Sequence, residues 1–229
     1  MATKNGATWS MDMGPAIRTA RETYRPAWEK ACRDLQSLDP RLVSWRSDTR
    51  YQEMEKGRGR FELPFLGRNY VIRYPDIAVW EEETGQEPSI TTQILLLHYL
   101  IHADGTPPTG QWIAFRQLPG GLGYEAAHKR RATIPLTRAF GQDRDAFVRA
   151  AQTLGGDPLE FGDASFLFRL LPRLWVAVVL HLGDEELPSS VRLLYDAAAE
   201  HYLPTEDLAI LADLLGNDLI QEGGKRRRR

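Results

Sequence analysis

Residues 165–182 read SFLFRLLPRLWVAVVLHL, and this stretch decides the fold class. It contains two hydrophobic runs, 165–170 and 174–182, which have the length and composition of β-strands. Pro172-Arg173 lies between them and leaves room only for a short turn. Residues 191–195 form a third run of the same kind. The C-terminal half therefore predicts an antiparallel meander of three strands.

The chain before the meander mixes short strands with helices. Residues 61–65 and 70–74 flank Gly67-Arg68-Asn69, a pattern that predicts a β-hairpin. Residues 90–103 give the strongest helix signal, because the segment follows Pro88-Ser89 and is apolar almost all round. A helix without a polar face belongs in a protein core, so we expect this one to be buried.

Capped or amphipathic segments predict the remaining helices. The first is expected from Gly14-Pro15 to Leu38, with a kink or a break at Pro26. The last begins at Pro204 and carries apolar residues at i, i+3, i+4 and i+7. The weaker signals are strands at 78–80 and 112–115, a helical stretch from Tyr124 and a helix over 143–154.

These elements predict a single α+β domain over residues 14–222, with a mixed, mainly antiparallel sheet and helices packed on it. A length of 229 residues is within the reach of one hydrophobic core. Residues 1–13 lack periodicity and predict a flexible leader, and residues 223–229 predict a disordered basic tail.

The charge distribution argues against a surface that wraps nucleic acid. The last five residues, 225–229, contribute +5 to a formal net charge of −2, which leaves −7 for the rest of the chain. Binding along a nucleic acid needs a basic face that displaces counterions from the phosphates. Contact with nucleic acid or an anionic membrane is therefore expected only through the tail arginines, Arg226, Arg227, Arg228 and Arg229.

Cysteine usage and hydropathy indicate a cytoplasmic protein. Cys32 is the only cysteine, so no disulfide can form within the chain and no cysteine cluster can hold an iron–sulfur centre. The N-terminus shows no secretory signal. The longest apolar stretches, 94–101 and 174–182, are shorter than the roughly 20 residues of a membrane span, so we expect no transmembrane segment.

A glycine loop over 120–123 is the first candidate site. From Gly121 the sequence matches G-x-G-x-x-A, but the second strand that a dinucleotide-binding fold requires does not follow. The loop precedes the basic run 128–131, and glycine backbone beside cations can hold a phosphate or a carboxylate. The alternatives are a tight turn and a solvated helix face. The predicted ligand-binding residues are Arg116, Gly120, Gly121, Tyr124 and His128.

Two histidines form the second candidate site. His98 and His102 are four residues apart, so both rings can lie on one face of the predicted helix, as in two-histidine metal sites. A third ligand would come from His201, Asp104 or His181. In the alternative, His98 hydrogen-bonds inside the core and His102 stabilises the C-terminus of the helix. No nucleophile motif such as G-x-S-x-G accompanies either histidine.

Six segments carry a family resemblance. They are FELPFLGR (61–68), QILLLHYL (93–100), ADGTP (103–107), WIAFR (112–116), LPGG (118–121) and YLPTEDL (202–208). In this order they resemble a family of bacterial and archaeal proteins designated domain of unknown function 3786, over roughly residues 50–215. The resemblance implies no established activity.

The resemblance does imply an accessory role. Some relatives are fused to ferredoxin-type iron–sulfur modules, and many come from anaerobes with corrinoid and one-carbon metabolism. A function near redox enzymes is what this implies. The present chain has no cysteine-rich module, so electron transfer would need a partner protein.

Two functional hypotheses follow from the sequence. The first is a non-catalytic accessory protein that binds an anionic small molecule or a partner protein, in the setting of anaerobic redox or corrinoid metabolism. The second is a metal-dependent enzyme in which His98, His102 and a carboxylate such as Asp104 or Glu206 hold the ion. The sequence identifies no cofactor.

Overall fold

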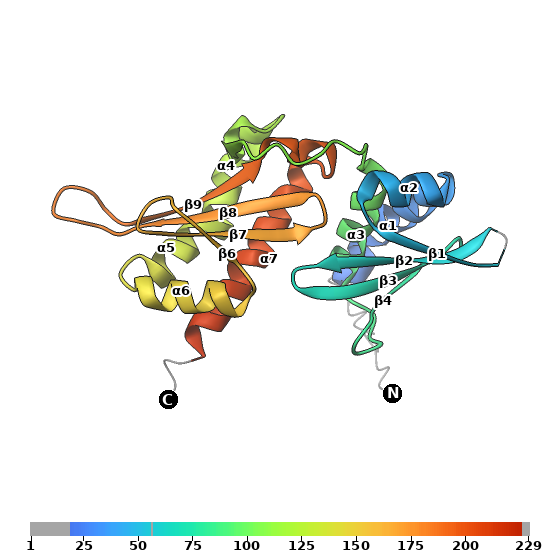
Figure 1. Cartoon of the computed structure of the whole chain (residues 1–229), viewed down its shortest axis with the longest axis horizontal. Coiled ribbons are helices and arrows are strands. Elements are labelled where there is room, and N and C mark those ends of the chain that lie inside the picture. Colours follow the sequence, from blue (N-terminus) through green and yellow to red (C-terminus); the bar gives the residue numbers. More distant parts are fainter. Residues whose placement is uncertain (1–18, 56, 226–229) are drawn as a thin grey trace, which may run out of the picture.

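The computed structural model describes residues 19–55 and 57–225, so the predicted leader (1–13) and the tail arginines (226–229) lie outside the described residues. Two lobes lie side by side, each with one antiparallel sheet (Figure 1). Residues 103–111 run from one lobe to the other. Buried residues of both lobes belong to one hydrophobic cluster. The predicted α+β class is confirmed, with two sheets in place of one.

The N-terminal lobe combines three helices with a four-stranded sheet of order β1-β2-β3-β4. Neighbouring strands are antiparallel throughout this sheet. Strand β2 alternates between buried and more exposed residues, so one face of the sheet is apolar and joins the core. The elements are α1 (Ala20–Gln36), α2 (Pro40–Ser47), β1 (Arg50–Glu55), β2 (Arg58–Phe65), β3 (Arg68–Tyr74), β4 (Ala78–Glu81) and α3 (Ile90–His102).

Helix α1 begins with a complete capping box. The Thr19 hydroxyl accepts the N–H of Glu22, and the Glu22 carboxylate accepts the N–H of Thr19 at 2.8 Å. The helix continues through Pro26, which removes only one main-chain donor, so it is not split there. Helix α1 packs against α3.

The C-terminal lobe packs its helices on one face of a five-stranded sheet of order β5-β9-β8-β7-β6. The predicted meander forms its centre, and neighbouring strands are antiparallel. Phe166, Val178 and Leu193 face the helices and belong to the core. The elements are β5 (Trp112–Ala114), η1 (Phe115–Gln117), α4 (Gly121–His128), η2 (Lys129–Thr133), α5 (Ile134–Phe140), α6 (Arg144–Thr153), β6 (Asp157–Leu159), β7 (Ala164–Leu171), β8 (Leu174–His181), β9 (Ser190–Asp196), η3 (Ala197–His201) and α7 (Thr205–Gly224).

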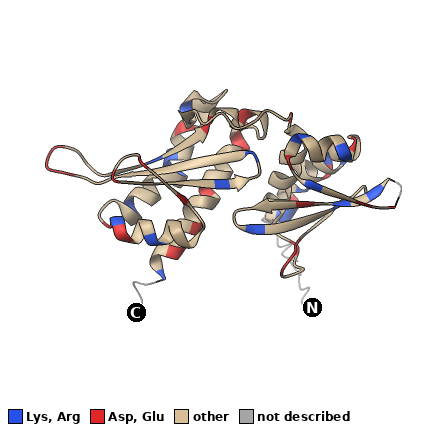
Figure 2. Cartoon of the chain, in the orientation of Figure 1, with Lys and Arg blue, Asp and Glu red and all other residues tan. Residues whose placement is uncertain are grey.

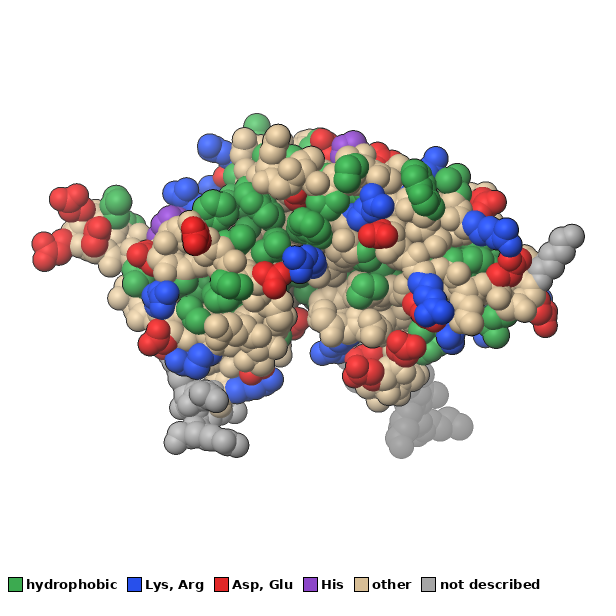
Figure 3. Space-filling view, in the orientation of Figure 1, with side chains coloured by type: hydrophobic (Ala, Val, Ile, Leu, Met, Phe, Trp, Pro, Cys, Tyr) green, Lys and Arg blue, Asp and Glu red, His purple; other side chains and the backbone are tan. Residues whose placement is uncertain are grey.

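The opposite face of this sheet is also apolar. Leu167, Trp175 and Leu194 share that face through the strand register, and hydrophobic side chains gather over the C-terminal lobe in Figure 3. The guanidinium of Arg169 lies 5.4 Å from the centre of the Trp175 ring. Asp157 holds the same guanidinium at 2.6 Å, so cation and indole are fixed together at the edge of the face.

Elements that the sequence did not predict include α2, β1, β6 and the short helices η1 and η3. Strand β1 is exposed at all but one of its residues, so hydrophobic alternation cannot reveal it. Helix α7 also extends further than predicted. Gly223 and Gly224 lie in the predicted tail but are helical, and Gly223 packs closely against the ring of Phe140.

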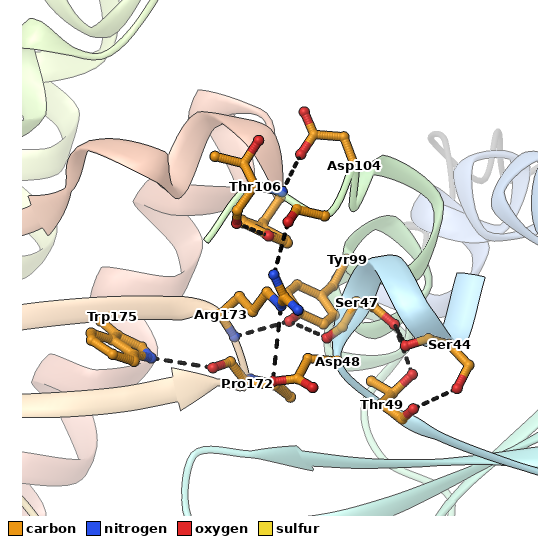
Figure 4. Close-up of polar contacts among 12 residues, drawn as sticks. Ser44, Ser47, Asp48, Thr49, Tyr99, Asp104, Thr106, Pro172, Arg173 and Trp175 are labelled. Carbon is orange, nitrogen blue, oxygen red and sulfur yellow. Dashed lines mark hydrogen bonds and ion pairs between the residues drawn. The ribbon is translucent and has the colours of Figure 1, made fainter. Parts of the chain in front are cut away.

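A buried tyrosine joins the two lobes (Figure 4). The Tyr99 hydroxyl of α3 donates to the carbonyl of Ser47 at 2.8 Å and accepts the main-chain N–H of Arg173 at 3.1 Å. Arg173 lies in the turn between β7 and β8, and its Nη1 donates to the carbonyl of Gly105 at 2.8 Å. The Tyr202 ring stacks on Tyr99 with centroids 5.6 Å apart. The turn of the meander is thereby held against the N-terminal lobe.

The surface mixes charges of both signs. In the view of Figure 2, basic and acidic residues are interspersed over both lobes, which is not the continuous basic face that nucleic acid needs. Within residues 19–55 and 57–225, no helix combines the length and the apolar character needed to cross a membrane.

Replacing Tyr99 with phenylalanine tests the junction between the lobes. The change leaves the Arg173 N–H and the Ser47 carbonyl without their partner in a buried position. We expect Tyr99→Phe to lower the free energy of unfolding by about 1–3 kcal/mol, measured by urea denaturation. Tyr24→Phe, at a tyrosine of α1 that is 46% exposed, is the matched control. Equal effects of the two substitutions would contradict the role of the Tyr99 hydroxyl.

Candidate functional site

A cavity of about 600 Å³ lies in the C-terminal lobe, beside the end of strand β5. Its walls come from β9, from the residues that follow β5 and from the helical stretch α4–η2–α5. Arg116, Arg138 and Arg192 line it from three separate segments. We name it the arginine cavity.

The short strand β5 leaves part of β9 without a second strand neighbour. Ala114 pairs with Leu194 in the last step of the β5–β9 ladder, after which the chain turns into η1. Residues 190–193 pair only with β8. On their open side, the Thr137 hydroxyl of α5 accepts the N–H of Val191 at 3.0 Å. The arginine cavity lies between this strand edge and α5.

The helical wall contains a π-helical turn. Elements α4, η2 and α5 follow one another without a gap, and η2 is the π-helical part. Pro135 lies two residues beyond Thr133, the last residue of η2, and a proline in a helix removes one donor and crowds the carbonyl four residues earlier. The wider turn relieves that crowding. Such turns occur frequently at functional sites, and Lys129 and Thr133 of this one line the cavity.

Positive charge exceeds negative charge in the cavity lining. Lys129 pairs with Glu125 at 2.7 Å, and this hydrogen bond lowers the pKa of the Glu125 carboxyl, with a smaller contribution from Arg116. Among the described residues, no ion pair or side-chain hydrogen bond engages Arg116, Arg138 or Arg192. Three guanidinium groups are therefore available to an anion at this place.

His128 forms a wall of the cavity as a neutral ring. Its side chain is 4% exposed and stacks on Phe115, with ring centroids 4.1 Å apart. Its Nε2 lies 3.0 Å from the Tyr195 hydroxyl. Burial lowers the pKa of His128 to about 4, so the ring carries no charge at neutral pH. The neutral ring can make van der Waals contact with a ligand, but it contributes no positive charge to the cavity.

The other predicted ligand-binding residues, Gly120, Gly121 and Tyr124, do not line the arginine cavity. Gly120 has a φ of 72° at the start of α4, which favours glycine. A Cβ on Gly121 would lie 2.1 Å from the Phe115 carbonyl oxygen, so the glycine permits α4 to pack on η1. The Tyr124 hydroxyl donates to Glu206 at the start of α7. The glycine loop has the geometry of a tight turn.

His98 and His102 lie close together on α3. Their ring centroids are 5.7 Å apart, and the rings stand at 79° to each other. Nδ1 of His98 is 2.6 Å from a carboxylate oxygen of Asp207 in α7, so His98 contacts the C-terminal lobe. Partial desolvation of the ring lowers the pKa of His102, and the neighbouring His98 adds to this effect.

The candidate third ligands lie elsewhere. His201 of η3 bonds to Asp104 through Nδ1 at 2.6 Å, and His181 ends strand β8. Within the described ranges, no group of three or more His, Cys, Asp or Glu side chains is arranged to hold a metal ion. The metal-dependent enzyme stays a prediction that lacks a three-residue centre in this part of the chain.

A hollow of about 700 Å³ lies beside α1 in the N-terminal lobe. Arg21 and Arg25 line it together with Trp28. Both arginines are already paired, Arg21 with Glu87 and Arg25 with Glu29, each at 3.1 Å. This hollow is larger than the arginine cavity, but both of its arginines are engaged by carboxylates. It therefore offers an anion fewer free cations than the arginine cavity does.

Sequence reasoning found Arg116 and His128 but missed Arg138 and Arg192. The available signal for Arg192 was its exposed position between the buried Val191 and Leu193 of one strand. No sequence pattern identifies Arg138 as a cavity residue, because Arg138 lines the cavity only as a result of the packing of α5 against β9.

Comparisons with known proteins identify a family but no function. A family model described as Domain of unknown function (DUF3786) matches residues 39–218, a range that includes parts of both lobes and the whole arginine cavity. No curated protein and no solved structure matches the chain.

The neutral His128 predicts a pH dependence of stability. An unfolded histidine has a pKa near 6.5, so between pH 6.5 and 4 the unfolded chain takes up a proton that the folded chain excludes. His128 should therefore lower the free energy of unfolding by about 2 kcal/mol as the pH falls from 7 to 5. We expect His128→Gln to lose this part of the pH slope in urea denaturation. An equal change of slope in His181→Gln would contradict the assignment.

Proposed function

The chain belongs to the DUF3786 family, and from that premise we propose that it is a non-catalytic binding protein for a small anionic molecule. The ligand is a carboxylate or phosphate that also carries an apolar part. It binds in the arginine cavity, where Arg116, Arg138 and Arg192 contact the anionic group.

The single observation that carries this proposal is the convergence of three unpaired arginines. Each comes from a different segment, after β5, in α5 and in β9, yet all three line one cavity. An arginine presents several donors in a planar fork that matches carboxylate and phosphate oxygens. The one carboxylate among the described lining residues, Glu125, is paired with Lys129. Like charges repel one another, so the grouping of three arginines is costly unless an anion joins them.

The cavity also suits the apolar part of such a ligand. Phe115, Ile134 and Leu193 contribute hydrocarbon surface to its lining. Ligand sites are usually of about 300–1,000 Å³ and mainly apolar with a few placed polar groups, and the arginine cavity has that character. Its position at the unpaired half of β9 adds main-chain groups that a ligand can reach.

The state of the polar lining residues favours binding over catalysis in this proposal. Its histidine, His128, is a neutral ring bonded to Tyr195, and burial raises the pKa of that tyrosine. The described lining residues include no serine or cysteine, and the hydroxyls of the lining threonines, Thr133 and Thr137, donate to main-chain carbonyls of their own helix. Binding without reaction is the simplest activity for these groups.

Isothermal titration calorimetry tests the proposal with inorganic phosphate, octanoate, flavin mononucleotide and a corrinoid, cobalamin. The panel separates bare anions from anions with an apolar part, and it includes the cofactor class that the family resemblance implies. We expect an amphiphilic anion to bind and Arg116→Gln/Arg138→Gln to weaken it at least tenfold, since each lost charged hydrogen bond costs about 1.5–3 kcal/mol.

Arg33→Gln provides the matched control, because it removes an exposed arginine from α1 in the other lobe. Binding should be unchanged in this variant. A panel without any binder, or binding that the double substitution leaves intact, would contradict the proposal.

A further inference from the structure

We propose that His98 and His102 of α3 form a binding site for a divalent transition-metal ion, such as Zn²⁺ or Cu²⁺, completed by water molecules. The two histidines are one helical turn apart, with ring centroids 5.7 Å apart. Imidazole nitrogen is a ligand that suits both ions. The pair shares no residue with the arginine cavity, so this site is independent of the proposed anion site.

Asp207 prepares His98 for this role. Its carboxylate is 2.6 Å from Nδ1 of His98, and the residue is only 8% exposed. A carboxylate can only accept here, so Nδ1 carries the proton and Nε2 keeps its lone pair for a metal. Histidines that bind metals almost always have such a partner on the other ring nitrogen. Asp207 is a positioning residue, since it acts through His98.

An ion can reach both rings from solvent. The His98 side chain is 26% exposed, and His102 is exposed. Each ring is anchored on a rigid helix that packs against α1 and α2. The site therefore needs no rearrangement of the backbone to accept an ion.

Only two side chains supply ligands in this proposal. The described part of the chain has no group of three or more metal-binding side chains. The Asp34 carboxylate of α1 interacts electrostatically with His98, but Lys30 holds it at 2.5 Å. Where the protein supplies fewer than four ligands, zinc completes its shell with water.

The position of the pair gives a bound ion a structural consequence. His98 belongs to the N-terminal lobe, and Asp207 belongs to the first turn of α7 in the C-terminal lobe. A metal on Nε2 strengthens the hydrogen bond that Nδ1 donates, because it withdraws electron density from the ring. The ion should therefore stabilise the contact between the lobes.

Calorimetric titration of the full, untagged chain with ZnCl₂ and CuCl₂ in a non-coordinating buffer tests the site. We expect one ion per chain, and at least a tenfold loss of affinity in His98→Gln and in His102→Gln. His181→Gln, at the end of β8, is the matched control and should keep the affinity of the original chain. The spectrum of bound Cu²⁺ in electron paramagnetic resonance should show two imidazole nitrogens in the original chain and one in each single variant.

Asp207→Asn tests the positioning role separately. We expect it to weaken Zn²⁺ binding by about 10- to 100-fold while Cu²⁺ still shows two nitrogens. The thermal unfolding midpoint without metal reports any purely structural effect of this substitution. A lower midpoint with unchanged Zn²⁺ affinity would overturn the role of Asp207.

Two results would overturn the site itself. One is the absence of binding by either ion. The other is binding that both histidine substitutions leave unchanged, which would show an adventitious ion only. Neither result bears on the arginine cavity, whose probes are anions.

Discussion

The hydroxyl of Tyr99 is the contact on which the arrangement of the two lobes depends. It is fully buried, and a buried hydroxyl is stable only when it is hydrogen-bonded. Its two partners, the Ser47 carbonyl and the Arg173 N–H, come from opposite lobes. The side chain of Ser47 is fixed in turn by the Val43 carbonyl at 2.7 Å. One oxygen atom therefore links the meander to the N-terminal helices, and burial raises the pKa of this tyrosine so that it stays protonated.

Further contacts between the lobes lie on the same side of the junction or beside it, and they include the main-chain bond from the Leu66 N–H to the Leu170 carbonyl at 3.1 Å. With the turn at Arg173 in place, the end of α3 lies along the start of α7, which brings His98 to Asp207 and Asp104 to His201. The Tyr202 hydroxyl reaches the Thr106 carbonyl in the connecting segment. None of these residues lines the arginine cavity, which lies between β9 and α5. A ligand can therefore occupy the cavity without opening the junction.

Hydrophobic pattern predicted those parts of the fold whose side chains must be buried. The runs 165–170 and 174–182 correspond to β7 and β8. They are apolar because nearly all side chains on both faces of these two strands are buried. Strand β1 escaped prediction because it exposes nearly all its side chains, and only Tyr51, which packs on Phe61, marks its inner face. The division into two lobes could not be predicted either. It depends on contacts such as Tyr99 with Arg173, which are 74 positions apart in the chain.

The candidate site was predictable only where local sequence and tertiary surroundings agree. The run 128–131 predicted an anion site from its density of positive charge, yet burial neutralises His128, Glu125 pairs with Lys129, and Asp213 lies 3.8 Å from Arg131. Basic side chains that are close in sequence form ion pairs with nearby carboxylates. Glu125 is one helical turn from Lys129 and pairs with it for this reason. The arginines left unpaired are isolated in sequence and meet only in the fold. Unpaired charge in a cavity, rather than charge density along the chain, is therefore the quantity that identifies an anion site in this protein.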